Sequence, residues 1–147
     1  MNKIHWLDWS KASFIKAQDA HKLILLDLSA VWCHWCHRMD EDTYSQADII
    51  DFINQHFIPL RVDIDQRPDL AERYNFGGFP TTAFLYADGT VILGGTYIPP
   101  DHFRSIMRQL HEAHETHTIQ AARTTFFEQR EHMMEHDLKA CKPFLDK

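Results

Sequence analysis

Residues 29–40 read SAVWCHWCHRMD, and the chemistry of the whole chain depends on how this stretch is interpreted. The cysteines at 33 and 36 fit a dithiol redox centre. Residues 33–37 also match C-x-x-C-H, the attachment signature of c-type haem, and two cysteines beside two histidines fit a zinc site. The flanking sequence is needed to choose between these three chemistries.

The composition is that of one globular domain with a substantial core. The chain has 147 residues, of which 44% are hydrophobic, too apolar a mixture for a disordered protein. Its formal net charge of −6 argues against nucleic acid as the main partner, because phosphate binding needs a basic surface. Eleven histidines would offset that negative charge near pH 6.

Cysteine usage indicates a redox or metal site. Cys33 and Cys36 form one close pair, and Cys141 is a distant single, whereas a small secreted scaffold carries more cysteines at wider spacing. No apolar run approaches the roughly 18 residues of a membrane span, and charges interrupt the first 22 residues, which lack a signal-peptide core. We therefore expect a cytoplasmic protein without a membrane span, or a periplasmic or exported one if a leader has been removed.

The apolar pattern predicts alternating strands and helices. Strands are expected at 23–28, 57–64, 81–86 and 91–93, and helices at 10–20, after the cysteine motif, after 45–48, at 69–74 and from 99. Ser10 is expected to cap the first helix and residues 45–48 to form a capping box, while Asp88-Gly89 predicts a two-residue type I′ hairpin turn. Pro59 is expected near the start of its strand or at an unpaired position. The order indicates a three-layer α/β/α sandwich with an added N-terminal helix and a long helical C-terminal tail.

The C-terminal part differs from the rest of the chain. Residues 1–117 are expected to form the domain, and residues 118–147 a more polar helical extension. Phe126 and Met133, and then Phe127, Met134 and Cys141, recur at sevenfold spacing. We interpret this pattern as a helix that docks on its own domain, the alternative being a seam for a partner helix and hence an oligomer.

A cysteine pair between a strand and a helix places Cys33 at the helix N-terminus, where its thiolate would be the nucleophile. The helix dipole contributes about 0.3–1 kcal/mol, and one pKa unit is about 1.36 kcal/mol, so the dipole lowers a thiol pKa by less than about one unit. A near-neutral thiol pKa needs further lowering. Hydrogen bonds from backbone N–H groups and the Cys36 thiol to the Cys33 sulfur, with positive charge on His34 or His37, are expected to supply it. Cys36, one turn into the helix, is expected to be the shielded, resolving thiol.

Asp27 interrupts the apolar run LILLDL at 23–28. A carboxylate there is costly unless it is paired or protonated, so we expect a raised pKa and a role as proton acceptor for Cys36. The alternative is a solvated aspartate at a sheet edge. Proline precedes the strand at 81–86, but a cis bond between Phe79 and Pro80 does not follow from the sequence.

Three segments resemble thioredoxin-fold proteins in order and spacing: residues 27–36, VDIDQ at 62–66 and Phe79-Pro80-Thr81. CHWCH at 33–37, VDIDQRPD at 62–69 and GGTYIPP at 94–100 further resemble the N-terminal thioredoxin-like domain of the spermatogenesis-associated protein 20 family. Together these matches cover roughly residues 20–100.

The resemblance implies a thioredoxin-like fold in which Cys33 attacks, Cys36 resolves and Asp27 is a buried acid/base. It also implies that Pro80 is a cis-proline facing the disulfide and that the backbone of Phe79 pairs with an extended substrate. The predicted substrate-binding residues are Trp32, His34, Trp35 and Phe79. His34 and Trp35 stand where ordinary thioredoxins have Gly-Pro, a departure that affects the redox potential.

The competing interpretations fit less well. Haem needs an export route and a second axial ligand. Zinc could be held by the cysteines with His37, or by His111, His114 and His117, but the latter do not share one narrow helical stripe. A non-catalytic binding or chaperone module has little need for two thiols at a helix start.

We therefore predict a thiol–disulfide oxidoreductase that acts as a protein-disulfide reductase without cofactor or metal. The reductase direction follows from the expected cytoplasmic setting. Its partners would be a disulfide-containing protein or small molecule and an unidentified upstream reductant, with neither nucleic acid nor a membrane span.

Overall fold

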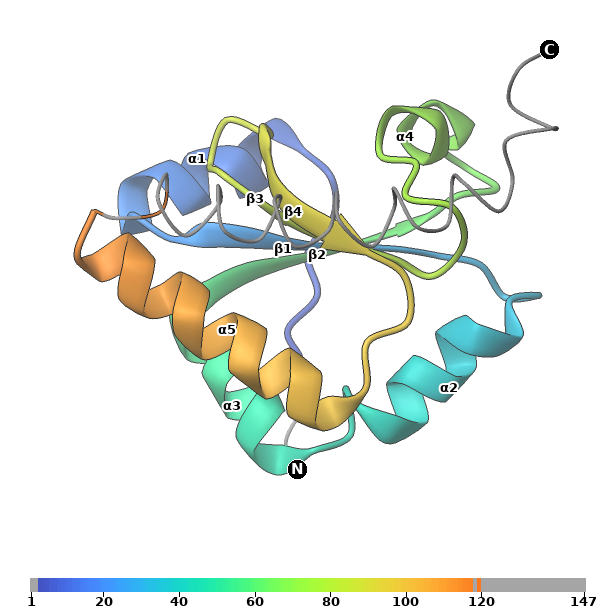
Figure 1. Cartoon of the computed structure of the whole chain (residues 1–147). Helices are drawn as coiled ribbons and strands as arrows, with labels where there is room; N and C mark the ends of the chain where they lie inside the picture. The colour runs from blue at the N-terminus through green and yellow to red at the C-terminus, as the bar shows by residue number, and fades with distance from the viewer. Residues whose placement is uncertain (1–2, 118, 120–147) are drawn as a thin grey trace, which may run out of the picture.

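The computed structural model describes residues 3–117 and 119, and it contains a four-stranded sheet between two layers of helices (Figure 1). In chain order the elements are α1 (Lys11–Ala20), β1 (Leu23–Ser29), α2 (His34–Asp42), α3 (Ala47–His56), β2 (Phe57–Asp63), α4 (Pro68–Arg73), β3 (Thr81–Leu85), β4 (Val91–Gly95) and α5 (Pro100–Glu115). The predicted order of strands and helices through α5 is confirmed.

The sheet has the strand order β2-β1-β3-β4. Strand β1 runs parallel to β2 and antiparallel to β3, and β3 pairs antiparallel with β4. Because β1 has a neighbour on each side and helices over both faces, residues 23–28 are all buried. This position explains why the sequence there is a continuous apolar run rather than an alternating one.

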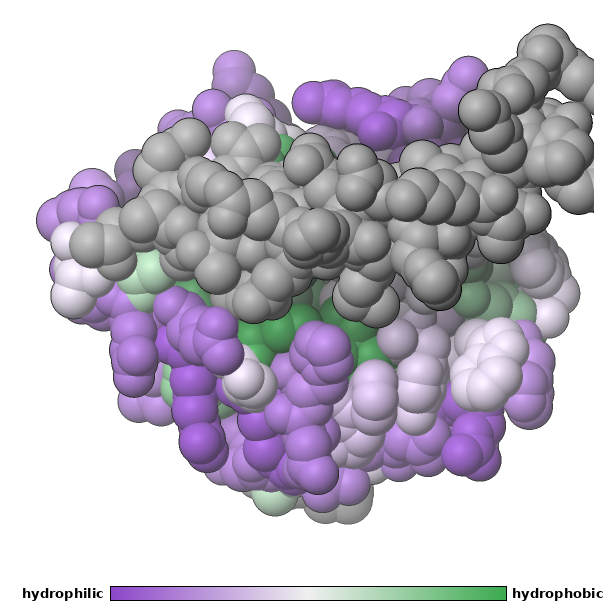
Figure 2. All heavy atoms as spheres, in the orientation of Figure 1, coloured by the Kyte–Doolittle hydropathy of each residue, from purple (hydrophilic) through white to green (hydrophobic). Residues whose placement is uncertain are grey.

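Helices α1 and α4 cover one face of the sheet, and α2, α3 and α5 lie on the other (Figure 1). Each face has its own apolar core. One centres on Phe84, Phe103 and the isoleucines of α3, and the other on Leu26, Leu60 and Tyr74. The apolar residues Phe103, Ile106, Leu110 and Ala113 of α5 are buried. The outward side of that helix is largely hydrophilic (Figure 2).

Of the two predicted helix caps, one is confirmed and one is wrong. The Ser10 side chain accepts a hydrogen bond from the Ser13 N–H and begins α1. The Ser45 hydroxyl instead donates back to the carbonyl of Glu41, in the preceding helix. Helix α3 therefore starts at Ala47 after Gln46, whose side chain makes no capping bond.

The predicted type I′ turn at Asp88-Gly89 is also wrong. A type I′ turn needs positive φ at both central residues, but only Gly89 has it, with φ 89°. The Gly89 N–H donates to the Tyr86 carbonyl at 3.0 Å, and the Tyr86 N–H donates to the Thr90 carbonyl at 2.9 Å. The connection is thus a longer loop that ends in a left-handed glycine.

The N-terminal segment lies against the outer edge of β2. The Leu7 N–H donates to the Pro59 carbonyl at 2.8 Å, and the Leu7 carbonyl accepts from the Arg61 N–H at 3.1 Å. In a strand the nitrogen and carbonyl of one residue point to the same side, so the Pro59 nitrogen faces this edge and not β1. Pro59 is the third residue of β2 and lies opposite Leu25 of β1, so the prediction that it lies near the start of its strand is confirmed.

Within residues 3–117 and 119, no helix has both the length and the apolar character needed to cross a bilayer. The predicted extension at 118–147, with its sevenfold pairs and Cys141, lies outside the described residues except for Ile119.

Candidate redox site

Cys33 and Cys36 lie at the start of α2 and are joined by a disulfide, with their Cα atoms 5.3 Å apart. Cys33 is the N-cap residue, and its Sγ accepts a hydrogen bond from the Cys36 N–H at 3.2 Å. This local arrangement arises because β1 ends at Ser29 and the short loop after it turns the chain into the helix. The cysteine pair therefore sits where unpaired backbone N–H groups favour negative charge on sulfur.

The Phe79–Pro80 peptide bond is cis, as the family resemblance implies. Pro80 is buried and directly precedes β3, whereas Phe79 is half-buried. The Phe79 ring meets the Trp32 ring edge-on, with centroids 6.4 Å apart. This contact brings the proline loop beside the residue that precedes Cys33.

Aromatic side chains surround the cysteines, and we call Trp32, Trp35, Phe79 and Tyr97 the aromatic rim. Trp32 is 61% exposed and Trp35 is 53% exposed. Trp32 donates its indole N–H to Asp65 at 3.0 Å, and the Trp35 ring lies 5.3 Å from that of Tyr97. These anchors fix two large apolar surfaces in solvent beside the disulfide. Tyr97 and Asp65 were not among the predicted site residues.

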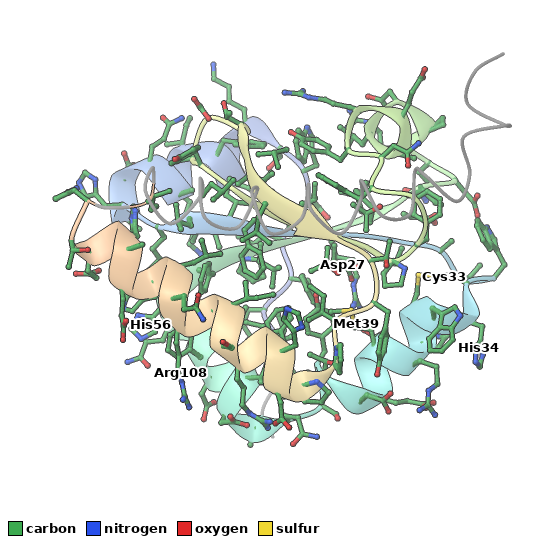
Figure 3. The ribbon with its side chains drawn as sticks, in the orientation of Figure 1. Asp27, Cys33, His34, Met39, His56 and Arg108 are labelled. Carbon is green, nitrogen blue, oxygen red and sulfur yellow. A yellow bond between two sulfur atoms is a disulfide. The ribbon has the colours of Figure 1, made fainter. Side chains whose placement is uncertain are left out.

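The two histidines of the motif have different surroundings. His34 is exposed and points away from the domain (Figure 3), with its ring 5.6 Å from that of Trp35. His37 turns back, and its Nε2 lies 2.8 Å from the carbonyl oxygen of Val31. His37 therefore ties the helix to the loop before Cys33.

Asp27 is only 1% exposed, so the predicted burial is confirmed. Burial raises its pKa to about 6, although the neighbouring Arg61 guanidinium acts in the opposite direction. Asp27 lies two residues before the end of β1, the strand that leads to the cysteines, and Figure 3 shows it between Cys33 on one side and His56 and Arg108 on the other. The carboxyl group therefore lies at the cysteine end of the sheet, with a proton affinity suited to exchange near neutral pH.

The ion-pair partner of Asp27 was not predicted from the sequence. Arg61 donates from Nε to Asp27 Oδ2 at 2.6 Å and from a terminal nitrogen to Asp40 Oδ1 at 2.5 Å. A signal was present in the sequence, because Asp27 and Arg61 are each the fifth residue of an apolar strand, 23–29 and 57–63. In the parallel pair β1–β2 these positions face each other.

The histidines at 111, 114 and 117 do not gather into one site. The His111 ring stacks on His56 with centroids 4.0 Å apart, and His114 Nε2 lies 2.7 Å from the His21 carbonyl oxygen. Across residues 3–117 and 119, no three His, Cys, Asp or Glu side chains are arranged to hold a metal ion.

Comparison with known proteins relates the chain to thioredoxin-like families. The model of the family Thioredox_DsbH, described as "Protein of unknown function, DUF255", matches residues 1–139. An uncharacterized Caenorhabditis elegans protein is 35% identical over 114 residues, and human spermatogenesis-associated protein 20 is 30% identical over 125 residues. These matches cover 72% and 76% of this chain but only 16% of each relative.

A shorter relative is the disulfide bond reductase DsbH of Chlamydia pneumoniae, 24% identical over 97 residues, with 58% of each chain covered. Among solved structures, a DsbH oxidoreductase superposes with a TM-score of 0.65 at 18% identity, over 75% of this chain and 85% of that one. A Thermus thermophilus thioredoxin gives 0.66 at 20% identity, over 78% and 91%. The fold is thioredoxin-like, and the cysteine pair within it supports thiol–disulfide chemistry in general.

Proposed function

The chain belongs to the Thioredox_DsbH (DUF255) family, and we propose that it is a protein-disulfide reductase. The observation that carries the proposal is the geometry of Cys33, which caps α2 and accepts a hydrogen bond from the Cys36 N–H. When the disulfide is reduced, the same N–H would donate to a thiolate, and hydrogen bonds to charged acceptors are stronger than neutral ones. Cys33 is thereby favoured as the ionised, attacking sulfur.

The reaction divides into two exchanges. The Cys33 thiolate attacks one sulfur of the substrate disulfide, and the other substrate sulfur leaves as a thiolate. Cys36 then loses its proton to the Asp27 carboxylate and attacks Cys33 Sγ, which forms the Cys33–Cys36 disulfide and releases the second substrate thiolate. Two electrons pass from the protein to the substrate, and an upstream dithiol must return them for the next cycle.

The aromatic rim provides a surface for a polypeptide substrate. Trp32 and Trp35 expose large apolar rings beside the cysteines, and aromatic side chains of this kind dominate protein recognition surfaces. We propose that Trp32, His34, Trp35 and Phe79 contact the polypeptide that carries the disulfide. The reductase direction is supported by the similarity to the Chlamydia pneumoniae relative, which is described as a disulfide bond reductase.

Cysteine variants test the mechanism. Cys33→Ser should abolish reduction of insulin disulfides, because no thiolate is left to attack. Cys36→Ser should still attack but stall as a mixed disulfide, visible as a covalent adduct on non-reducing gels. Cys141→Ser is the matched control and should reduce insulin at the unmodified rate. Full activity in both Cys33→Ser and Cys36→Ser would rule out the mechanism.

The direction of electron flow is tested by equilibrating the Cys33–Cys36 couple with glutathione. A reductase should have a potential close to that of thioredoxin, about −270 mV, rather than that of the oxidant DsbA, about −120 mV. A potential near that of DsbA would be consistent with thiol–disulfide exchange but would reject the reductase assignment.

A non-catalytic peptide-binding module is the second candidate, and the exposed rings of the aromatic rim are the observation that favours it. The double variant Cys33→Ser/Cys36→Ser distinguishes the two. It should lose insulin reduction if the protein is a reductase, whereas a binding module would suppress aggregation of an unfolded protein equally well with and without the cysteines.

A further inference from the structure

The proline loop, residues 74–80, connects α4 with β3 and carries Phe79 and Pro80. Its two ends are fixed. The hydroxyl of the buried Tyr74 donates to the Gly89 carbonyl at 2.8 Å at the start of the loop, and at its end the chain enters β3, which is paired on both sides. The position of the middle of the loop therefore depends on contacts that its own side chains make.

One such contact is made by Phe76, whose ring lies on the backbone of Gly94 in the edge strand β4. A Cβ atom built on Gly94 would have three outer carbons of that ring, Cζ, Cε1 and Cε2, within 2.7 Å. Because these three carbons are nearly equally distant, the ring presents its face and not its edge to the strand. Carbon atoms pack at about 3.5–4.0 Å, so any side chain at position 94 would displace the ring by about 1 Å.

Glycine at position 94 provides room for the ring and is not required by the backbone conformation. The glycines with positive φ are Gly77 and Gly89, and Gly94 is not among them. A glycine inside a strand weakens the sheet, and an aromatic ring that covers it offsets this loss. The next residue, Gly95, differs, because a Cβ atom built there would meet nothing within 4 Å. Of these two neighbouring glycines, only Gly94 has a structural reason to lack a side chain.

The contact of Phe76 is connected to the aromatic rim through a short piece of chain. Phe76 and Phe79 lie three residues apart and pack against the same apolar core. Between them, a Cβ atom built on Gly78 would lie 3.6 Å from Thr96 Cγ2, so the loop follows the chain as it leaves β4. The Phe79 ring then meets that of Trp32. A displacement of Phe76 should therefore reach Phe79 and the ring that Phe79 contacts.

We propose that Phe76 and Gly94 are positioning residues that hold the proline loop where a polypeptide substrate can pair with it beside Cys33. The inference rests on the proposed function and deepens it, because it assigns the placement of the substrate-binding loop to a contact outside the aromatic rim. Both residues act through Phe79 and take no part in the exchange of sulfur bonds. Their contact should matter for a disulfide carried by a polypeptide, which binds along the loop, and not for a small disulfide, which only has to reach Cys33.

Gly94→Ala in the full chain tests the proposal. With dithiothreitol as the reductant, its KM for insulin should rise about tenfold, because misplacing a positioning group by about 1 Å weakens productive binding, and kcat should stay within about twofold. The rate at which its Cys33 thiolate reacts with Ellman's reagent, a small disulfide, should equal that of the wild type. Gly95→Ala is the matched control, since it adds the same methyl group to the next residue of the strand, and it should keep the wild-type KM.

A smaller side chain at position 76 should rescue the variant. Gly94→Ala/Phe76→Leu should return KM toward the wild-type value, because leucine leaves room for the methyl group, whereas Phe76→Ala alone should raise KM, because the loop loses its contact. The proposal is overturned by a wild-type KM in Gly94→Ala, by an equal rise in Gly95→Ala, by an equal loss toward Ellman's reagent, or by a rise that Phe76→Leu does not reverse. If Gly94→Ala does not fold, a wild-type KM in Phe76→Ala overturns it.

A second measurement does not require activity. The indole N–H resonance of Trp32 in the disulfide form is sensitive to the Phe79 ring beside it. This resonance should shift in Gly94→Ala, stay in place in Gly95→Ala and return in Gly94→Ala/Phe76→Leu, and an unshifted resonance in Gly94→Ala would reject the positioning role. If the wild type did not reduce insulin, the proposed function would be rejected, and the Trp32 resonance would still decide whether the contact with Gly94 positions the loop.

Discussion

A carboxyl group in the centre of a buried strand raises the question of why it is ionised at all. Asp27 has apolar neighbours along β1 but faces Arg61 in the next strand. Burial was predictable from LILLDL, and the raised pKa followed from it. Arg61 and Asp40 were not predicted, because the partner of a buried charge depends on strand register, which the sequence does not show directly.

Asp27→Asn should stabilise the protein at high pH. The pKa of Asp27 rises from 3.8 to about 6 on folding, so the folded state binds more protons than the unfolded state between these values. The associated stability is fully present below about pH 4 and is lost as the pH rises to about 6, a loss of about 3 kcal/mol. The variant should exceed the wild type by up to that amount at pH 8.

The measurement is urea unfolding of both proteins at pH 4 and pH 8. At pH 4 the two free energies of unfolding should agree closely, because the wild-type carboxyl is then protonated. A variant that is less stable than the wild type at pH 8 would mean that the pairing with Arg61 outweighs the burial of the charge.

At the scale of single elements, apolar periodicity located the strands and helices well, but their connections were predicted less reliably. The Ser45 capping box and the type I′ turn both rested on short residue patterns. In the folded protein Ser45 is still within reach of the last turn of α2, and the hairpin loop extends to Thr90. Local patterns specify which turns are allowed, whereas the distance between packed elements selects one of them.

The two serines allow this conclusion to be tested. Ser10→Ala should lower the free energy of unfolding by about 1 kcal/mol, because the Ser13 N–H loses its acceptor at the start of α1. Ser45→Ala is the matched control and should change it by less than about 0.5 kcal/mol, since Ser45 does not cap α3. Chemical unfolding of both variants provides the comparison. An equal decrease in the free energy of unfolding for Ser10→Ala and Ser45→Ala would show that Ser45 caps α3 after all.

For the whole molecule, the order of predicted strands and helices gave the three layers, whereas the cis bond at Pro80 was implied only by the resemblance to thioredoxin-like proteins. The aromatic rim was only partly predictable, because Tyr97 reaches Trp35 from the segment after β4. Residues far apart in the chain meet at the site only after the sheet has formed. At the other end of the molecule, α3 and α5 meet through stacked histidines, His56 and His111.

This histidine contact should make stability depend on pH. Burial lowers the pKa of His56, and the positive charges of His111 and Lys22 add to the effect, with Glu115 acting in the opposite direction. The folded state therefore resists protonation, so its stability is present above about pH 6.5 and is lost as the pH falls through the lowered pKa. His56→Gln should flatten this decline in thermal melts between pH 7 and pH 5.

Thermal melts of variants that also carry Asp27→Asn separate the pH dependence of stability due to His56 from the opposite pH dependence due to Asp27. The exposed His102 of α5 provides the control, and His102→Gln should keep the wild-type slope. An unchanged slope in His56→Gln would show that the stacked pair carries no linkage to protons.

The backbone pairing of Leu7 with β2 has a practical consequence for truncation. A fragment trimmed to begin at Ser10 would leave the Arg61 N–H and the Pro59 carbonyl without their partner, and an uncovered strand margin invites self-association. The same truncation would remove Trp6, whose ring centroid lies 4.4 Å from the guanidinium carbon of Arg61. The shortened protein should therefore self-associate more readily and change the surroundings of Arg61, although every cysteine would still be present.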